Sequence, residues 1–357
     1  MSVVRGKAMM LGALMIAICA GAAPVAQAAY ITTTIQLPGA LATIGVGIDG
    51  SGRVLGYGYV DDGTGTSTIV RRGFLWQNGT TIAFSVPGSD TLPTAISNNG
   101  LVVGTAYDSQ NVASGFVFNG ASFAATGTYP TSVNDAGQIV GQYDDSGTPR
   151  GFVSDGTTFT PIDVPGGTNA RANGINASGA IVGQYQQADS SYAGFSMVGG
   201  IIHPFFIPGA TNAIPMAVND SNQVIATAVD AGSGTPEAFL VSNLGVTPII
   251  VPGGTEATPI AINNSGMIVG TYRDTNGDTR SFLDDNGVYS QIAVPGSTYT
   301  VANAINGSGQ IAGIALDPNG GASAFFAQNI DISEPASWAV LAVSLALATY
   351  ARRRRPS

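Results

Sequence analysis

One nine-residue pattern, Ile/Val-Asn-x-x-Gly-x-Ile/Val-Val-Gly, recurs along most of the chain and limits its folds more than any other feature. Its copies begin at Ile48, Ile96, Val133, Ile175, Val218, Ile262 and Ile305. Successive copies start 37 to 48 residues apart, close to the roughly 40 to 45 residues of a four-stranded propeller blade. The period therefore predicts a repeat architecture.

Two further elements accompany the copies. A small residue followed by Phe comes about twenty residues after each start, and an alternating stretch ending in Pro-Gly closes most units. The Phe residues are Phe74, Phe116, Phe152, Phe195, Phe239, Phe282 and Phe325. Pairs such as Asn78-Gly79 separate the Phe element from the last stretch and favour two-residue hairpins. Each unit therefore predicts four short strands.

The last unit lacks its fourth strand, and an unpaired copy of that strand, Ile31 to Gly39, precedes the first unit. Pairing of this copy with the strand of Phe325 would close a ring and cover an exposed edge. We therefore predict an all-β, seven-bladed β-propeller of about 43-residue, four-stranded repeats over residues 29–328, closed by the N-terminal strand. The alternative, a linear β-solenoid, needs no such exchange between the termini.

These units resemble the HAF-type extracellular repeat, which is named for a motif at its Phe-containing strand. The motif takes forms such as Arg72-Gly73-Phe74 and Ala193-Gly194-Phe195, and the resemblance covers roughly residues 31–328. It rests on the overall pattern, because no copy carries the eponymous His-Ala-Phe triplet. The resemblance implies an extracellular location and a repeat architecture more than an activity.

Residues 1–28 have the layout of a secretory signal peptide. Arg5 and Lys7 form a basic start, an apolar run follows, and small residues surround Gln27. We expect cleavage after Ala28. A lipoprotein that uses Cys19 is the alternative, although Ile18 occupies the place where a small residue is wanted.

The C-terminus has three parts: a linker with a sorting motif (329–337), an apolar segment (338–351) expected to form a short helix, and a basic tail (352–357). This layout resembles the PEP-CTERM sorting signal, which in that family is recognised and cleaved by an exosortase in Gram-negative bacteria that make extracellular polysaccharide. The matching residues are Ser333, Glu334, Pro335, Arg352, Arg353, Arg354 and Arg355, with Ser333 in place of the first proline of Pro-Glu-Pro.

The apolar segment is short of the roughly 20 residues that span a bilayer comfortably, but the arginines would hold its end in the cytoplasm. We expect an exosortase-type enzyme as a partner and an inner-membrane anchor before processing. A plain C-terminal membrane anchor is the alternative. Both interpretations place the body outside the inner membrane, at the cell surface or released from it.

Composition excludes several functional classes. Apolar residues make up 44% of the chain and charged residues 10%, with 49 glycines and 19 prolines, which is typical of many short strands joined by tight turns. Cys19 is the only cysteine, so the body has no disulfide or Cys-based metal site. Six of the 13 basic residues lie at the two ends, which leaves seven against 22 acids, and such a body should repel nucleic acid.

Aspartates gather in the expected turns between second and third strands. They are Asp61, Asp62, Asp108, Asp144, Asp145, Asp189, Asp230, Asp274, Asp278 and Asp317. Asp274, Asn276 and Asp278 supply oxygens at alternate positions, as Ca²⁺ prefers, so these three residues with Asp144 and Asp145 are the candidate cation or ligand site. The alternative is that Asp and Asn occupy such turns for their backbone angles alone. No other cofactor is expected.

No catalytic set emerges from the sequence. His203 is the only histidine and has no Cys or second His for zinc. Glu237 and Glu256 break the repeat, as residues of a single active site in a ring of copies should, but their spacing from any partner is unreadable. The arginines near the Phe strands and inner loops, Arg171 among them, are expected to form local ion pairs with the aspartates.

We therefore expect a monomeric, exported, non-catalytic binding or structural module for extracellular polysaccharide, matrix or surface proteins. The alternative is a polysaccharide-active hydrolase or lyase that uses acids on the loop face. A third interpretation is a scaffold whose acidic face is loaded with Ca²⁺. These three interpretations rest on the predicted fold, the predicted targeting segments and the family resemblance.

Overall fold

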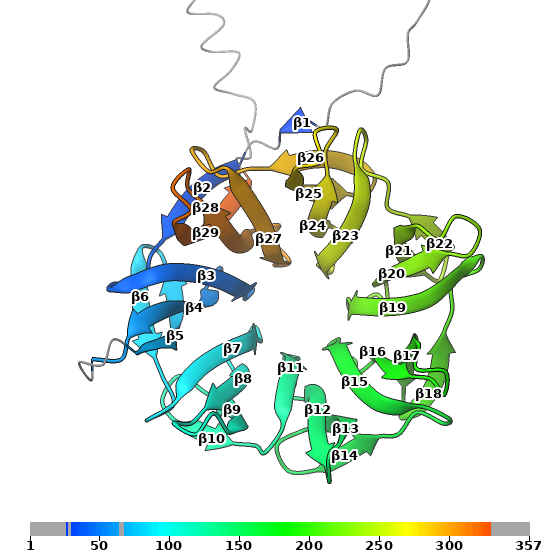
Figure 1. Cartoon of the computed structure of the whole chain (residues 1–357), viewed down its shortest axis with the longest axis horizontal. Coiled ribbons are helices and arrows are strands. Elements are labelled where there is room, and N and C mark those ends of the chain that lie inside the picture. The colour runs from blue at the N-terminus through cyan, green and yellow to red at the C-terminus, as the bar shows by residue number, and fades with distance from the viewer. Residues whose placement is uncertain (1–25, 28–29, 64–67, 330–357) are drawn as a thin grey trace, which may run out of the picture.

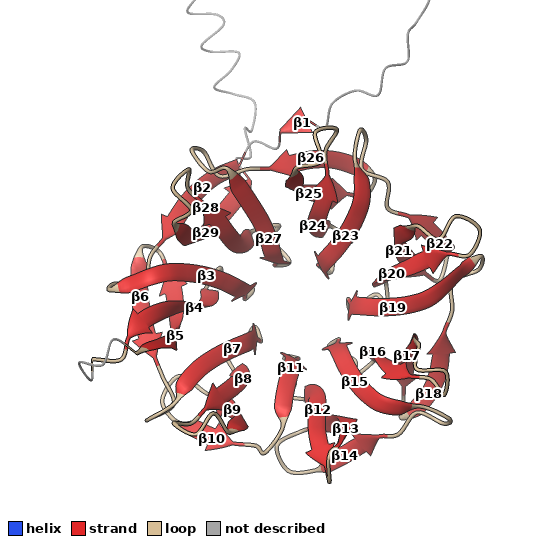
Figure 2. Ribbon diagram, viewed as in Figure 1, coloured by secondary structure: helices blue, strands red, loops and turns tan. Residues whose placement is uncertain are grey.

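The computed structural model describes residues 26–27, 30–63 and 68–329, which form 29 strands and no helix. Seven sheets stand around a common centre (Figure 1), and only strands and loops occur in the described part (Figure 2). The prediction of an all-β, seven-bladed propeller is thereby confirmed, and a linear solenoid is excluded.

Blades 1 to 3 each contain four antiparallel strands that run in sequence order from the centre outward. They are β3 (Ala40–Ile48), β4 (Val54–Asp61), β5 (Ile69–Gln77) and β6 (Thr80–Phe84) in blade 1; β7 (Asp90–Ile96), β8 (Val102–Tyr107), β9 (Ala113–Phe118) and β10 (Phe123–Ala125) in blade 2; and β11 (Tyr129–Val133), β12 (Ile139–Asp145), β13 (Thr148–Ser154) and β14 (Phe159–Ile162) in blade 3. Strand β10 is short because residues 126–128 replace the usual stretch ending in Pro-Gly.

Blades 4 to 6 repeat this order. They comprise β15 (Thr168–Ile175), β16 (Ile181–Gln186), β17 (Tyr192–Val198) and β18 (Ile201–Phe205) in blade 4; β19 (Ala210–Val218), β20 (Val224–Asp230), β21 (Pro236–Ser242) and β22 (Gly245–Pro248) in blade 5; and β23 (Thr255–Ile262), β24 (Ile268–Arg273), β25 (Thr279–Asp285) and β26 (Val288–Ile292) in blade 6. A two-residue strand, β1 (Ala26–Gln27), adds to β26 in parallel.

Blade 7 joins the two ends of the chain. Its three inner strands are β27 (Tyr299–Ile305), β28 (Ile311–Leu316) and β29 (Ala322–Asn329). The outer position is taken by β2 (Tyr30–Ile35), which pairs antiparallel with β29 so that Thr34 lies opposite Phe325. The prediction that the N-terminal strand completes the last blade is confirmed.

The Gly of the repeated pattern and the Phe about twenty residues later are cross-strand partners. Gly313 lies opposite Phe325 on β28 and β29, and Gly270 lies opposite Phe282. A Cβ atom at Gly270 would stand 2.3 Å from the carbonyl oxygen of Thr258 and 2.8 Å from the ring of Phe282. Glycine is therefore required because the Phe ring and the inner strand occupy this space.

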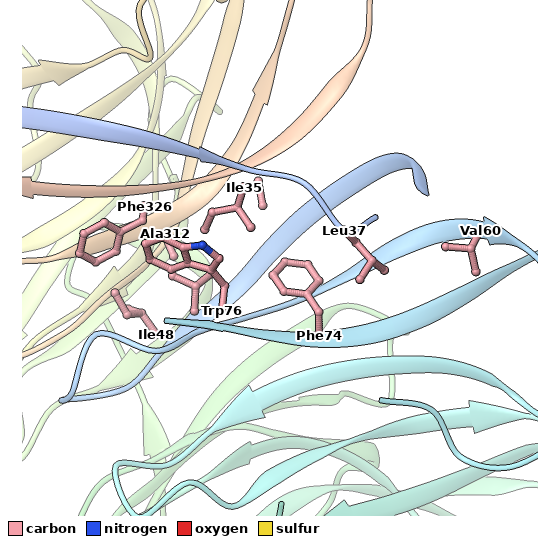
Figure 3. Packing of buried hydrophobic residues seen from close by; sticks show 10 residues of the cluster. Ile35, Leu37, Ile48, Val60, Phe74, Trp76, Ala312 and Phe326 are labelled. Carbon is pink, nitrogen blue, oxygen red and sulfur yellow. The ribbon is translucent and has the colours of Figure 1, made fainter. Parts of the chain in front are cut away.

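The hydrophobic core lies between and within the blades. At the closure, Ile35, Trp76 and Phe326 belong to one cluster of buried side chains (Figure 3). The ring centroids of Trp76 and Phe326 are 5.3 Å apart. Because β2 and β29 belong to blade 7 and β5 belongs to blade 1, side-chain packing joins these two blades.

The Asn of the repeated pattern ties each blade to the next. Its side-chain amide donates to the backbone carbonyl of the equivalent residue in the following blade, at 2.8 to 3.0 Å. The donors are Asn134, Asn176, Asn219, Asn263 and Asn306, all buried. Blades 1 and 2 carry Asp49 and Ser97 at this position. Asn98 of blade 2 makes the contacts to the neighbouring blades instead: it accepts from the backbone N–H of Gly50 and donates to the carboxylate of Asp135.

The ring has two distinct faces. Inner strands end at the Asn turns on one face, here called the turn face. They begin at the Pro-Gly loops on the other, here called the Pro-Gly face. On the Pro-Gly face, Ala231 of a second-to-third-strand turn donates to the Gly209 carbonyl at 2.9 Å. On the turn face, the Tyr30 hydroxyl donates to the carbonyl of Gly309 at 3.4 Å. Tyr30 at the start of β2 and Asn329 at the end of β29 therefore both lie on the turn face, because they pair with each other.

The predicted signal peptide lies outside the described residues apart from β1. The predicted sorting motif and the apolar and basic tail segments also lie outside them. No helix that could cross a membrane occurs within residues 30–63 and 68–329. The predictions of export, anchoring and a monomeric state stay predictions.

Candidate binding site at the mouth of the central channel

Every inner strand carries a β-bulge at the same place. The bulged residues are Val46, Thr94, Thr131, Asn173, Met216, Ile260 and Asn303. A bulge inserts one unpaired residue into a ladder and is common next to binding sites. Four of these residues, from blades 2 to 5, line a cavity at the centre of the ring.

The polar bulge residues also link neighbouring blades. Thr131 donates to the carbonyl of Ala172 at 2.6 Å, and Asn173 donates to that of Pro215 at 2.9 Å. Thr94 bonds to Pro130 in the same way. These bonds fix the wall of the channel, so the side chains nearer the Pro-Gly face are presented from a rigid frame.

The positions two residues before the bulges distinguish blades 3 and 4 from the rest. Cross-strand pairs at this level are Ile44–Tyr57, Leu92–Thr105, Tyr129–Gln142, Arg171–Gln184, Ile214–Thr227, Thr258–Thr271 and Val301–Ile314. Four of the seven inner-strand residues are aliphatic. Blades 3 and 4 instead offer an aromatic residue and a guanidinium group, each beside a glutamine amide.

These exceptional pairs share one cavity of about 490 Å³. Its walls come from blades 2 to 5 and comprise Thr94, Thr105, Tyr107, Tyr129, Pro130, Thr131, Gln142, Arg171, Asn173, Gln184 and Met216. Tyr107 ends β8 and Tyr129 begins β11, so the cavity lies at the mouth of the channel on the Pro-Gly face. A volume of this size accommodates a small ligand.

The rim of the cavity is braced by ionic contacts. The Arg71 guanidinium lies 5.0 Å from the ring centroid of Tyr107, within cation–π range. Asp90 holds Arg71 through two nitrogens, with the Nη2–Oδ2 distance at 2.7 Å. Hydrogen bonding to Asp90 raises the pKa of the Arg71 guanidinium above its ordinary value. The Arg71–Asp90 ion pair thus helps to hold the ring of Tyr107 in place at the rim.

The five residues predicted as a cation or ligand site lie in two separate turns, and one aspartate in each turn accepts hydrogen bonds from the backbone of that turn. Asp144 accepts from the backbone N–H of Gly147 at 2.6 Å, and Asp145 pairs with Arg150 at 3.2 Å. Asp274 accepts from the backbone N–H groups of Asn276 at 2.9 Å and Asp278 at 3.0 Å.

Arg280 binds both aspartates of the second turn, at 2.9 Å each. Its hydrogen bond holds the pKa of the Asp274 carboxyl below its ordinary value. Within the described residues, no group of three or more His, Cys, Asp or Glu side chains is arranged to hold a metal. The Ca²⁺ hypothesis stays a prediction.

The other residues singled out in the sequence are placed away from the channel. His203 is exposed on β18, the outermost strand of blade 4. Glu237 and Glu256, which have no readable relation in sequence, line one groove of about 480 Å³ between blades 5 and 6. Glu256 pairs with Arg273 at 3.2 Å.

Sequence reasoning missed the channel cavity. Arg171 was expected in an ion pair, whereas it stands exposed on β15 and lines the cavity. A usable signal existed in the repeat itself: Gln142 and Gln184 each follow the repeated Gly, where other blades carry Thr, Tyr or Ile.

The fold and the cavity define a seven-bladed β-propeller with a polar pocket at the mouth of its channel. It is similar to the β-propeller domain of the Trilobed protease from Pyrococcus furiosus, with a TM-score of 0.59 and 10% identity over 83% of this chain and 100% of that chain. That domain is described as having an open velcro topology, whereas β2 here pairs with β29.

Two peptidases also share the fold. Pyrococcus horikoshii acylaminoacyl peptidase gives a TM-score of 0.58 at 10% identity, covering 83% of this chain and 51% of that chain. A puromycin-hydrolyzing peptidase from Mycobacterium tuberculosis gives 0.56 at 11% identity, covering 87% and 55%. This chain thus spans about half the length of these peptidases. No family model and no curated protein matches it.

Proposed function

We propose that this chain is an exported, surface-associated or secreted, non-catalytic module that binds extracellular polysaccharide at the mouth of the channel. One observation carries the proposal. Among seven copies of one unit, the pairs Tyr129–Gln142 and Arg171–Gln184 depart from the repeat in adjacent blades and line the same cavity.

The chemistry of this cavity suits a sugar. Each glutamine amide offers both donors and an acceptor, and threonine hydroxyls do the same, which matches the hydroxyl groups of a carbohydrate. Tyr107 and Tyr129 add ring faces against which the apolar face of a sugar can pack. A few placed polar groups in a concave site are typical of small-ligand recognition.

The position of the two ends of the closing strand pair supports presentation at a surface. Tyr30 and Asn329 lie together on the turn face, whereas the cavity lies at the Pro-Gly face. Anchoring through the C-terminal segment would therefore turn the cavity away from the membrane. An exosortase-type enzyme would act on the sorting motif on the membrane side.

The direct test uses the full-length chain in detergent and the exopolysaccharide of its own host. We expect binding, and we expect Gln142→Ala with Gln184→Ala to weaken it about thirtyfold, because each of the two lost hydrogen bonds costs about 1 kcal/mol. Gln110→Ala, which removes an exposed amide in a turn of blade 2, is the matched control. Unchanged affinity in the double variant would refute the proposal.

A second candidate is a polysaccharide hydrolase or lyase in the groove between blades 5 and 6. Glu237 and Glu256 both line it, and glycoside hydrolysis commonly uses two carboxylates. Glu256 has a φ of 51°, a position that Asn169 and Asn212 occupy in the two preceding blades. A left-handed backbone is costlier for Glu than for Asn, and such strain collects at functional sites.

This candidate predicts that the full-length chain releases new reducing ends from the host polysaccharide and that Glu237→Gln or Glu256→Gln abolishes the release. The binding module predicts no release by any of the three proteins. Gln142→Ala separates the two candidates, because it lies outside the groove and would leave turnover at the groove intact.

A further inference from the structure

The electrostatics of the channel cavity differ from those of the rest of the molecule. The chain has 22 acids against 13 basic residues, yet Arg171 is the only charged side chain among the cavity's lining residues. No carboxylate lies in that wall. The cavity is therefore a small positively charged site in an acidic protein.

Arg171 also differs from most arginines of the described chain. Arg53, Arg71, Arg150, Arg273 and Arg280 each pair with a carboxylate at 2.6 to 3.2 Å. Within the described residues, Arg171 has no acidic partner at ion-pair distance, and its side chain is exposed in the cavity. Its charge is thus available to a ligand.

We propose that the cavity binds sugar units that carry a carboxylate, with Arg171 as the residue that pairs with it. A guanidinium group binds a carboxylate through two parallel hydrogen bonds. Gln184, its cross-strand partner, and Gln142 on the preceding blade offer amides to the ring hydroxyls. This inference rests on the proposed function and names its ligand class.

The charge of the Pro-Gly face around the cavity further restricts the class of ligand. The second-to-third-strand turns place aspartates on the same face as the cavity, including Asp144 and Asp189. A densely charged polyuronate is repelled by such a face. The best fit is therefore a polysaccharide in which isolated uronate units alternate with neutral sugars.

The test compares uronate-containing oligosaccharides with the same molecules after each carboxyl group is reduced to an alcohol, on an array probed with the full-length chain in detergent. We expect the acidic member of a bound pair to bind at least tenfold more tightly. Arg171→Gln should abolish this difference by weakening binding of the acidic member at least tenfold. Arg72→Gln, which removes one positive charge outside the cavity, should keep the difference.

Equal binding of acidic and reduced members, or an undiminished preference in Arg171→Gln, would overturn the carboxylate inference while the proposed function stands. Binding of no glycan on the array would overturn both. A thermal melt of each variant shows that it folds, so loss of the preference in Arg171→Gln reports on recognition.

Discussion

The side-chain amide of Asn306 donates to the backbone carbonyl of Asp49 at 2.8 Å, although 257 positions separate the two residues. The same bond joins blades 3 to 4, 4 to 5, 5 to 6 and 6 to 7. In four places this bond joins blades that follow each other in the sequence. In the fifth place it joins blade 7 to blade 1, which lie at opposite ends of the repeat. One residue of the repeated pattern thus serves both to stack the blades and to close the ring.

Replacing one of these asparagines should weaken the ring. Asn219 donates to the carbonyl of Asn263 at 3.0 Å and accepts from the backbone N–H of Gln223 at 2.9 Å. Asn219→Ala removes the acceptor of the Gln223 N–H and one of two donors to the Asn263 carbonyl, which still accepts from the N–H of Gly266 at 3.1 Å. We therefore expect a loss of about 1–3 kcal/mol in the free energy of unfolding measured with urea. Ser221→Ala, on the exposed side of the same turn, should change it little. Equal effects of the two variants would contradict this account.

The stability cost of truncating a side chain on the closing strand β2 should depend on whether that side chain points into the core. Ile35 on β2 is 1% exposed and belongs to the core cluster shared with Trp76, whereas Ile31 on the same strand is 51% exposed. We expect Ile35→Ala to cost about 2–5 kcal/mol and Ile31→Ala to cost less than about 1 kcal/mol. Urea denaturation measures both. A similar cost for both variants would mean that β2 does not pack as described.

The packing of each Phe ring against the opposite Gly predicts that even a methyl group added at this glycine lowers the stability of the fold. In Gly270→Ala, the new methyl group meets the Thr258 carbonyl and the Phe282 ring, so we expect a loss of about 1–3 kcal/mol from overpacking. Gly307→Ala meets no atom within 4 Å and should be neutral or slightly stabilising. The two unfolding curves in urea give the comparison, and a tolerated Gly270→Ala would refute the packing argument.

The turn of Asp274 predicts a measurable acid dependence. Its pKa is lowered in the folded protein by Arg280, so its contribution to stability is present above the ordinary Asp pKa of about 3.9 and is lost as pH falls through the lowered value. Asp274→Asn keeps the backbone contacts without this titration. Its melting temperature should fall less than that of the wild type between pH 5 and pH 2.

Arg280→Gln is the companion variant, because it removes the donor that lowers the pKa. We expect it to show the same reduced acid sensitivity as Asp274→Asn. The double variant should add nothing further if both act through one pair. An acid-induced drop as large as in the wild type would argue against the pairing.

The architecture was predictable because each level of the sequence repeats. Seven Phe residues follow seven starts, and the unpaired stretch from Ile31 supplies the missing strand. What the pattern did not reveal is why Gly270 and Phe282 recur together, since their opposition depends on strand register. The inter-blade bonds of Asn219 were also unreadable, because capping of its own turn is already a sufficient reason for an asparagine at this position.

The candidate site was less predictable from the sequence, because aspartates in the turns are the commonest polar side chains of the repeat and the cavity does not use them. Asp274 and Asp278 stand out in sequence, yet the turn and Arg280 satisfy much of their bonding capacity. Arg171 and Gln142 are 29 positions apart and come together only through the ring. Their departure from the repeat was visible in the sequence, but only alignment of the blades by bulge and register showed that both face one cavity.

Hydrogen–deuterium exchange tests the location of the binding site most directly. The full-length chain is compared with and without the glycan that binds it most tightly on the array. We predict that protection gathers at the start of β11 and β15 and at the end of β8, where Tyr129, Arg171 and Tyr107 line the cavity. Protection confined to the groove between blades 5 and 6, or to the acidic turns, would contradict it.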